Sequence, residues 1–319
     1  MLGDGVTTRT RIAAGSRGPL HSVDPPLFLV GPARSGTSLL YKILCMHPQA
    51  SYVSNWLARF PSRTRLAALN RLPRTRPELR RAVWFGQDGA NAYVYGRARS
   101  LRERLFPMPV EGEPLFAACG IPDRGEPSDP ALSADALRSA VRRIHAASGG
   151  SIFVNKRIAN IRRIPFLAET FPGARFVSLV RDGRAVALSL STVDWWPNHH
   201  VEWYGGTPTR WAAEGGDPWE LCARNWVEEL EAMEDGLGRI APSRVLRLTY
   251  EELVADPIRQ LAAIAAFGGF GDDPEWRRCV GSLSFPNRNE RWRATLDADA
   301  LATIERVQEL ALKEHGYEL

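Results

Sequence analysis

One local pattern constrains the fold of this chain more than any other: an apolar run, a glycine-rich loop and a helical pattern follow one another near the N-terminus. Residues 27–30 read LFLV, residues 31–38 read GPARSGTS, and residues 35–45 carry apolar side chains at helical spacing. A short continuous apolar run before a glycine turn is typical of a strand that is buried on both faces. The pattern therefore predicts a parallel sheet at the centre of the fold.

The same alternation of strand and helix patterns continues to the C-terminus. We expect further strands at residues 152–155, 176–180 and 245–248. The expected helices are at residues 161–171, 184–191, 219–240, 258–267 and 299–315. Strands that alternate with helices predict an α/β fold in three layers, with helices on both faces of a parallel sheet. We interpret residues 27–319 as a single domain and residues 1–26 as a flexible tail.

Residues 57–150 interrupt this frame, because they are rich in arginine and proline and have a weaker strand pattern. We interpret them as a helical insertion that shapes substrate specificity. The arginines of residues 57–104 fit a solvated helical face, and they also fit a surface for an anionic acceptor or for peripheral contact with a membrane. No basic module with interleaved aromatic residues is visible, so nucleic acid is not an expected partner.

Composition narrows the class of protein. The chain has 319 residues, of which 44% are hydrophobic and 24% are charged, so a sizeable core is possible and general disorder is excluded. No apolar run approaches the roughly 18 residues of a membrane span, and the first 26 residues lack the apolar core of a secretory signal. The four cysteines are far apart and form no CxxC pair, which favours a reducing, cytoplasmic location. The pattern specifies no oligomeric state.

The glycine-rich loop has the spacing of the P-loop motif GxxxxGK[ST], with Thr37 in place of the lysine. Loop amides and a helix N-terminus together form an anion site, so we expect Ser35, Gly36, Thr37 and Ser38 to bind a phosphate. A nucleotide triphosphatase uses the missing lysine to hold the β- and γ-phosphates. Arg34 supplies the cation here, so we expect the loop to bind a 5′-phosphate without a γ-phosphoryl group beyond it.

A second phosphate site follows the strand expected at 176–180. Arg181 lies at the carboxyl end of that strand, where open α/β sheets bind ligands, and Ser189 follows two helical turns later. An arginine can bind a phosphate through two hydrogen bonds, and a serine hydroxyl adds a third donor. Two phosphate sites without the P-loop lysine suit a 3′,5′-bisphosphate nucleotide better than ATP or NAD.

The two segments together resemble a known family. GPARSGTSLL with the later His47-Pro48 pair, and RDGRAVALS from Arg181, resemble the 5′- and 3′-phosphate motifs of the PAPS-dependent sulfotransferases, in particular of the branch with tyrosylprotein and bacterial carbohydrate or small-molecule enzymes. The resemblance implies in-line transfer of a sulfuryl group from PAPS, the 3′-phosphoadenosine 5′-phosphosulfate donor, to a hydroxyl or amine of a glycan, a glycolipid or a small molecule. Adenosine 3′,5′-bisphosphate (PAP) would be released.

The resemblance also assigns roles to individual residues. Lys156 corresponds to a catalytic lysine, and it is one of only three lysines among 41 basic residues. Arg34 would share its role of stabilising charge on the departing oxygen. Tyr250, in a segment that resembles RYEDL, would lie near the nucleotide. Arg291, with the following tryptophan, would close over it.

One family position differs. In the tyrosylprotein-like branch a glutamate follows the His-Pro pair by seven residues, and here that position is Asn55, which cannot take a proton. Our candidates for the base that accepts the hydroxyl proton are His199 or His200 first, and then Asp194 or Glu202. The adjacent histidines lack further ligands at metal-site spacing, so no metal is expected. The tryptophans between 195 and 226 fit core and lid packing, or a platform for a sugar or flat aglycone.

Two alternatives to a sulfotransferase stay open from the residues. One is a kinase or another P-loop enzyme that uses a nucleotide triphosphate, against which the missing loop lysine argues. The other is a non-catalytic module that binds PAPS and has lost its base, which Asn55 would permit. Lys156 and Arg34 argue against this second reading.

Overall fold

The computed structural model describes residues 25–86 and 105–319. Its central feature is a five-stranded sheet in which every pairing is parallel, in the order β2-β3-β1-β4-β5. The strands are β1 (Leu27–Val30), β2 (Ala50–Ser51), β3 (Ile152–Lys156), β4 (Arg175–Val180) and β5 (Val245–Thr249). Because β1 pairs with both β3 and β4, the loop that follows β1 lies at the middle of the carboxyl edge of the sheet.

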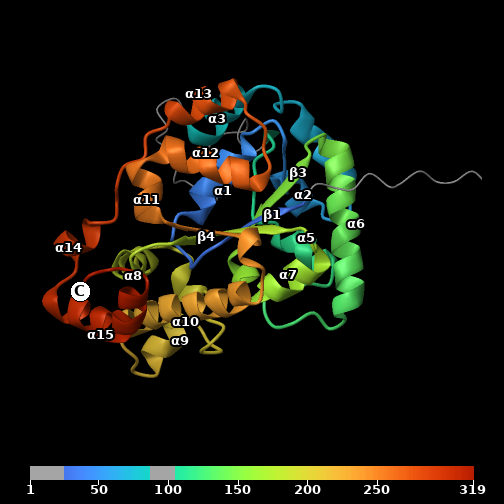
Figure 1. Ribbon diagram of the computed structural model, residues 1–319. Helices are drawn as coiled ribbons and strands as arrows, with labels where there is room; N and C mark the ends of the chain where they lie inside the picture. Colours follow the sequence, from blue (N-terminus) through green and yellow to red (C-terminus); the bar gives the residue numbers. More distant parts are fainter. Residues whose placement is uncertain (1–24, 87–104) are drawn as a thin grey trace, which may run out of the picture.

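The side chains of β1 point alternately into two cores, one on each face of the sheet. Leu27 and Leu29 belong to one apolar cluster, and Phe28 and Val30 belong to the other. Figure 1 shows the two layers of helices that close these cores. One layer contains α1 (Thr37–Cys45), α11 (Tyr250–Ala255), α12 (Pro257–Gly268) and α13 (Pro274–Gly281). The opposite layer contains α7 (Ile164–Thr170), α10 (Pro218–Gly238) and α15 (Ala298–Glu314). This arrangement is the three-layer, P-loop-like α/β fold that the sequence predicts.

Between β2 and β3 the regular elements that the structure describes are helices, joined by loops and by an isolated bridge between Ser54 and Pro109. These helices are α2 (Asn55–Arg59), η1 (Thr64–Arg71), α3 (Pro77–Phe85), α5 (Glu113–Ala118) and α6 (Pro130–Ser148). Helix α6 packs along η1 and beside the edge strand β2 and its neighbour β3. The tail expected over residues 1–26 lies outside the described residues apart from Pro25 and Pro26, and so does the stretch 87–104 of the expected insertion.

Short elements follow the strands at the carboxyl edge of the sheet. They are η2 (Ile158–Arg163), α8 (Gly183–Ser191), η3 (Trp196–Asn198), α9 (Pro208–Ala213) and α14 (Arg291–Thr295). A further short element, η4 (Pro242–Arg244), directly precedes β5. The helix expected at residues 161–171 is present as α7, but its predicted start is wrong: residues up to Arg163 form η2, and α7 starts at Ile164, because Pro165 favours the first turn of a new helix. The two-residue strand β2 was not predicted, since two residues are too few to form a pattern.

Candidate active site

The loop between β1 and α1 is held in one conformation by contacts with two other elements, β4 and α10. Gly31 lies against β4, where a Cβ would come within 2.3 Å of the Leu179 carbonyl oxygen, so a larger residue does not fit at this position. The amide of Ala33 donates a hydrogen bond to the Glu229 Oε2 atom of α10 at 2.7 Å. Arg34 has a left-handed backbone with φ of 71°, which is costly for a residue with a side chain. The loop is therefore fixed in a strained shape before any ligand binds.

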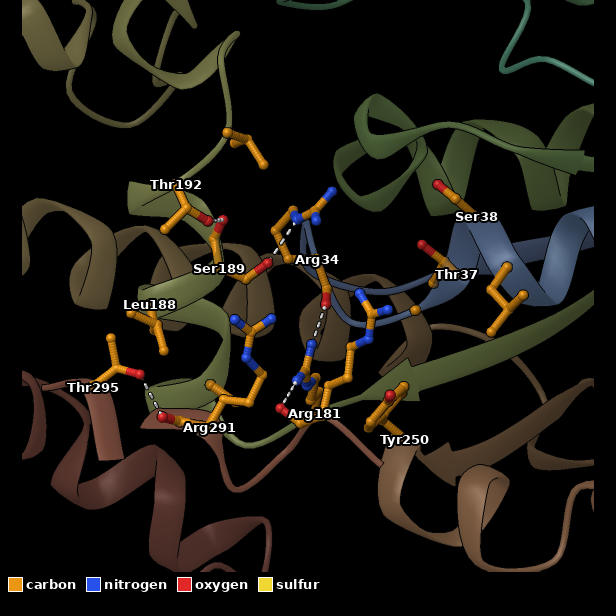
Figure 2. A pocket seen from close by; sticks show the side chains of 15 residues that line it. Arg34, Thr37, Ser38, Arg181, Leu188, Ser189, Thr192, Tyr250, Arg291 and Thr295 are labelled. Carbon is orange, nitrogen blue, oxygen red and sulfur yellow. Dashed lines mark hydrogen bonds between the residues drawn. The ribbon is translucent and has the colours of Figure 1, made fainter. Parts of the chain in front are cut away.

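Four arginines surround a cavity of about 430 Å³ at the end of this loop (Figure 2). The described residues that line it include Arg34, Gly36, Thr37, Ser38, Arg181, Ser189, Tyr250, Arg288 and Arg291. We call this space the arginine cavity. It brings together side chains from the loop, from α8, from the start of α11 and from α14, which are up to 261 positions apart in the sequence. The predicted phosphate-binding residues thus meet in one place, with the exception of Ser35.

Hydrogen bonds orient two of these arginines. Arg34 donates from Nε to the Ser189 hydroxyl at 2.9 Å, while Arg181 donates from Nη1 to the Arg34 carbonyl at 3.2 Å and from Nη2 to the Arg288 carbonyl at 3.0 Å. The Arg181 guanidinium also lies over the Tyr250 ring, 4.4 Å from its centroid. Ser35 is different, because its side chain is fully buried and its amide donates to the Pro32 carbonyl within the loop. Ser35 therefore shapes the turn and does not line the cavity.

The two cations at the loop lie close enough to oppose each other. Desolvation lowers the pKa of Arg34, and the neighbouring positive charge of Arg181 lowers the pKa of Arg34 further. Like charges that converge on one space are unfavourable until an anion lies between them. The arginine cavity is thus electrostatically suited to a ligand with more than one negative charge.

A second cavity of about 490 Å³ adjoins the first and shares Arg34 and Ser38 with it. Lys156, at the end of β3, lines this second cavity, and its Nζ atom lies 2.5 Å from the Glu111 Oε1 atom. We call this space the lysine cavity. The structure brings the predicted catalytic pair Arg34 and Lys156 together in the lysine cavity, and Arg34 also borders the arginine cavity.

The comparison with known protein families agrees with this geometry. A model of the sulfotransferase family matches residues 25–274. The chain belongs to the sulfotransferase family. The family predicted from the two phosphate motifs is thereby confirmed.

Similar proteins of this family are known from mycobacteria. The omega-hydroxy-beta-dihydromenaquinone-9 sulfotransferase Stf3 is 24% identical over 267 residues, in both Mycobacterium bovis and Mycobacterium tuberculosis. The match covers 78% of this chain and 64% of that relative. Sulfotransferase STF9 from Mycobacterium avium has a similar fold, with a TM-score of 0.56 and 16% identity over 93% of this chain and 78% of that one. Sulfotransferase STF1 from M. tuberculosis H37Rv gives a TM-score of 0.52 and 19% identity, over 90% and 76% of the two chains.

The histidines expected to serve as base in this sulfotransferase-family chain do line the lysine cavity. The His199 ring lies 5.1 Å from the Trp195 ring and is stacked on Trp196 at 5.7 Å. Burial is the largest cause that lowers the pKa of His199; Asp123 opposes it, while Arg124 and His200 add to it. The neighbouring groups that shift the pKa of His199 are therefore Asp123, Arg124 and His200, and Lys156 is not among them.

The two acidic residues proposed as base, Glu202 and Asp194, lie in different surroundings. Glu202 lines the lysine cavity, but its Oε1 atom accepts from the Gly125 amide at 3.4 Å and its Oε2 atom lies 3.5 Å from the Arg162 Nε atom. Asp194 is exposed and is not among the residues that line either cavity. The loop after α8 turns the Asp194 side chain away while it directs Trp195 inward.

Sequence reasoning missed three glutamates that line the lysine cavity: Glu111, Glu113 and Glu229. Glu229 interrupts the apolar face of α10 between Trp226 and Leu230, and a charged residue at a core position is a signal that the sequence does carry. Burial raises the pKa of Glu229, while the Ala33 amide and the cations Arg162 and Lys156 act in the opposite direction. Glu111 and Glu113 carry no such signal, because they lie in an insertion that no motif marks.

The tryptophans serve mostly for packing. Trp226 is fully buried, and the rings of Trp203 and Trp211 lie 6.2 Å apart with Tyr204 beside both. Trp195 lines the lysine cavity and is 39% exposed, so it is the residue of this group that can serve as a platform.

The described residues also bear on metal binding, on membrane-spanning helices and on the state of the cysteines. Within residues 25–86 and 105–319 no group of three or more histidine, cysteine, aspartate or glutamate side chains is arranged to hold a metal ion. None of the helices described there has the length and apolar character that a membrane crossing requires. All four cysteines are free and buried.

Proposed function

We propose that this chain transfers the sulfuryl group of PAPS to a hydroxyl or amine of a small-molecule, glycan or glycolipid acceptor by in-line displacement, with release of PAP. The observation that carries the proposal is the junction of the two cavities. The arginine cavity suits an anionic nucleotide, the lysine cavity suits a partly apolar acceptor, and Arg34 and Ser38 border both.

The residues present fit the nucleotide end of PAPS. Amides of the loop, with the hydroxyls of Thr37 and Ser38, would hold the 5′-phosphate, because they open onto the arginine cavity at the start of α1. Arg181 and Ser189 would hold the 3′-phosphate through charged hydrogen bonds. Tyr250 and Arg291 line the same cavity and would contact the rest of the nucleotide. Thr37 replaces the lysine that a triphosphate requires, which disfavours the kinase alternative.

Lys156 and Arg34 would carry the electrostatic part of catalysis. When bound, PAPS would supply an activated sulfuryl group at the junction of the cavities. Both cations would stabilise negative charge that grows on the departing phosphate oxygen, which is worth more in the transition state than in the ground state. The walls of the lysine cavity would position the acceptor and exclude water.

The lysine cavity supports a hydroxylated acceptor with an apolar ring or chain. Trp195 offers an aromatic face, while acidic and basic side chains alternate around it. Glu111, Glu113, Asp123 and Arg124 reach this cavity from within residues 57–150, which supports the view of that segment as the acceptor-side insertion. The mycobacterial Stf3 relative is named for a hydroxylated menaquinone acceptor, and a related class of acceptor is compatible with this site. The free buried thiols support a cytoplasmic location for the reaction.

Calorimetric titration of the purified chain with PAP, compared with ATP and Mg²⁺, tests the proposal. We expect PAP to bind more tightly than ATP, since ATP has no 3′-phosphate for Arg181 and Ser189. Arg34→Ala and Arg181→Ala should each weaken PAP binding about 10- to 100-fold, which corresponds to one charged hydrogen-bond group. Arg239→Ala is the matched control, because Arg239 is an exposed arginine paired with Asp235 on α10. Tighter binding of ATP, or no binding of PAP, would contradict the assignment.

A further inference from the structure

A short segment before α5 is hydrogen-bonded to Asn55, the residue that differs from the family pattern. The Asn55 amide donates to the Met108 carbonyl at 2.9 Å, and the Asn55 Oδ1 atom accepts from the Met108 amide at 3.1 Å. The Asn55 Nδ2 group donates to the Phe106 carbonyl at 3.2 Å. The Val110 amide then donates to the Val53 carbonyl at 2.9 Å. Asn55 therefore serves to fix the chain that leads to Glu111.

The chain turns sharply directly after Glu111. Gly112 has a φ of +87°, and a Cβ at this position would lie 2.9 Å from the Val53 Cγ1 atom, so only glycine fits. The Glu111 carbonyl accepts a hydrogen bond from the Asn155 Nδ2 group at 3.1 Å. The backbone of Glu111 and the residues on both sides of it are thus held in place beside the end of β3.

The Glu111 side chain lies in the lysine cavity beside Lys156. Its Oε1 atom lies 2.5 Å from the Lys156 Nζ atom, and it lines the lysine cavity together with Lys156 and Arg34. The Lys156 side chain is 5% exposed and that of Glu111 is 25% exposed, so Glu111 is the member of the pair that is open to the cavity. A molecule in the lysine cavity that approaches Lys156 meets this carboxylate.

The other carboxylates that line the cavity are occupied elsewhere. Glu229 is 8% exposed and accepts from the Ala33 amide of the loop. Glu202 binds the Gly125 amide and Arg162, and Glu113 forms an ion pair with Arg157. Asp123 lies 4.0 Å from Arg124 on the loop that also faces His199. Among the residues that the structure describes, Glu111 is the carboxylate in contact with the lysine of the proposed reaction centre.

We propose, on the basis of the proposed sulfuryl transfer, that Glu111 is the general base of this chain. Its carboxylate would take the proton from the acceptor hydroxyl while the acceptor oxygen forms its bond to sulfur. The bond between sulfur and the bridging oxygen of the 5′-phosphate breaks, and its electron pair stays on that oxygen, beside Lys156. The proton remains on Glu111 and passes to solvent after PAP leaves. The base would thus come from the insertion and not from the position of Asn55.

Acceptor acidity provides the test of this role. PAP release from PAPS is measured with phenol, with the more acidic 4-nitrophenol and with water alone, for the full chain and for Glu111→Gln. A base matters most when the acceptor holds its proton tightly, so E111Q should lose on the order of 10²- to 10⁴-fold in rate with phenol and with water. With 4-nitrophenol at pH 8, which is largely ionised, the loss should be below about tenfold. Glu111→Asp, which keeps the carboxylate, should recover at least tenfold of the loss with phenol.

Nucleotide affinity provides a readout that does not depend on turnover. Glu111→Gln removes the anion that is paired with Lys156, so a ligand phosphate no longer competes with it. We expect calorimetry to show PAP binding about threefold tighter, or more, in E111Q than in the unchanged chain. If Glu111 had only a structural role, Glu111→Gln would instead weaken both PAP binding and the folding of the loop. The same titration shows that each variant is folded.

Glu113→Gln is the matched comparison, because Glu113 lines the same cavity and is paired with the basic residue that follows Lys156. Its rate loss should be similar for phenol and 4-nitrophenol, since it takes no proton. Equal losses with both phenols in E111Q, or a phenol rate within threefold of the unchanged chain, would overturn the assignment. A chain that binds PAP but releases none from PAPS with any of the three acceptors would also overturn it and leave the nucleotide site standing. A chain that binds no PAP would instead contradict the proposed function itself.

Discussion

At the scale of single residues, the strained backbone of Arg34 is the feature that joins the two cavities. A left-handed conformation costs a residue with a side chain about 1–2 kcal/mol, so it persists only where neighbours impose it. Glu229 holds the preceding amide, Arg181 holds the Arg34 carbonyl and Ser189 holds its guanidinium. These three contacts direct the Arg34 side chain to the junction, where it lines both cavities.

Glu229 gives this arrangement a dependence on pH that can be measured. Because burial raises the pKa of Glu229 in the folded chain, its contribution to stability is fully present below the ordinary carboxyl pKa. That contribution is lost as the pH rises through the raised value. Glu229→Gln resembles the protonated form and can still accept from Ala33, so it should match the unchanged chain near pH 4 and exceed it in unfolding free energy as the pH rises. Urea unfolding of both chains from pH 4 to 8 measures this difference. A difference that stays constant with pH would show that Glu229 ionises as freely when folded as when unfolded.

At the scale of elements, α3 of the insertion covers the C-terminal end of α1, the helix that follows the loop after β1. Arg80 of α3 is fully buried, and its Nη1 group donates to the carbonyls of Cys45 at 2.8 Å, Met46 at 3.2 Å and His47 at 3.2 Å. Its positive charge also suits the negative end of the α1 dipole. The rings of Tyr52 and Trp84 cover the guanidinium. The insertion therefore stabilises α1 in addition to shaping the lysine cavity.

Arg80→Leu should lower the unfolding free energy by about 3 kcal/mol, because it leaves several buried carbonyl groups without a donor. Arg80→Lys keeps the charge but not the planar fork of donors, and it should lose roughly half as much. Denaturant unfolding followed by circular dichroism measures both values. Arg65→Ala serves as the control, since Arg65 of the same insertion is exposed and its loss should cost less than about 0.5 kcal/mol. A cost for Arg80→Leu no larger than that of the control would show that the α1 carbonyl groups are satisfied without Arg80.

Individual elements show which parts of the fold and of the candidate site could be predicted from the sequence and which could not. Strands such as β1 and β4 were predictable because a strand buried on both faces needs a continuous apolar run. The meeting of Arg34 and Arg181 in one cavity was predictable, because both follow strands of a parallel sheet and the carboxyl ends of such strands lie at one edge. The helix expected at 161–171 starts later, at Ile164, because apolar spacing continues across residues 161–163 although these belong to η2. Glu111 was not predictable, since its contact with Lys156 depends on a turn at Gly112. No pattern in the local sequence indicates which residue Glu111 contacts.

At the scale of the whole molecule, the arginine cavity joins parts of the chain that are otherwise connected weakly. Helix α14 is short, packs mainly on α8, and contributes Arg291 to the cavity. The segment before it is held by Arg181, which donates to the Arg288 carbonyl and to the Asn289 Oδ1 atom. A ligand that binds between Arg34, Arg181 and Arg291 would connect this C-terminal region to the loop after β1. Binding should therefore stabilise segments that are far apart in the sequence.

Hydrogen exchange with and without PAP tests this coupling across the molecule. PAP at one hundred times its dissociation constant should raise the unfolding free energy by about 2.7 kcal/mol. Amides that exchange only after PAP leaves should slow by up to about a hundredfold, and we expect these in residues 31–38, 183–189 and 288–295. Arg291→Ala should remove the protection of residues 288–295 and leave most of that in residues 31–38, because the 5′-phosphate contacts remain. Protection confined to residues 31–38 in the unchanged chain would contradict the coupling, since it would mean that the C-terminal region does not close on the nucleotide.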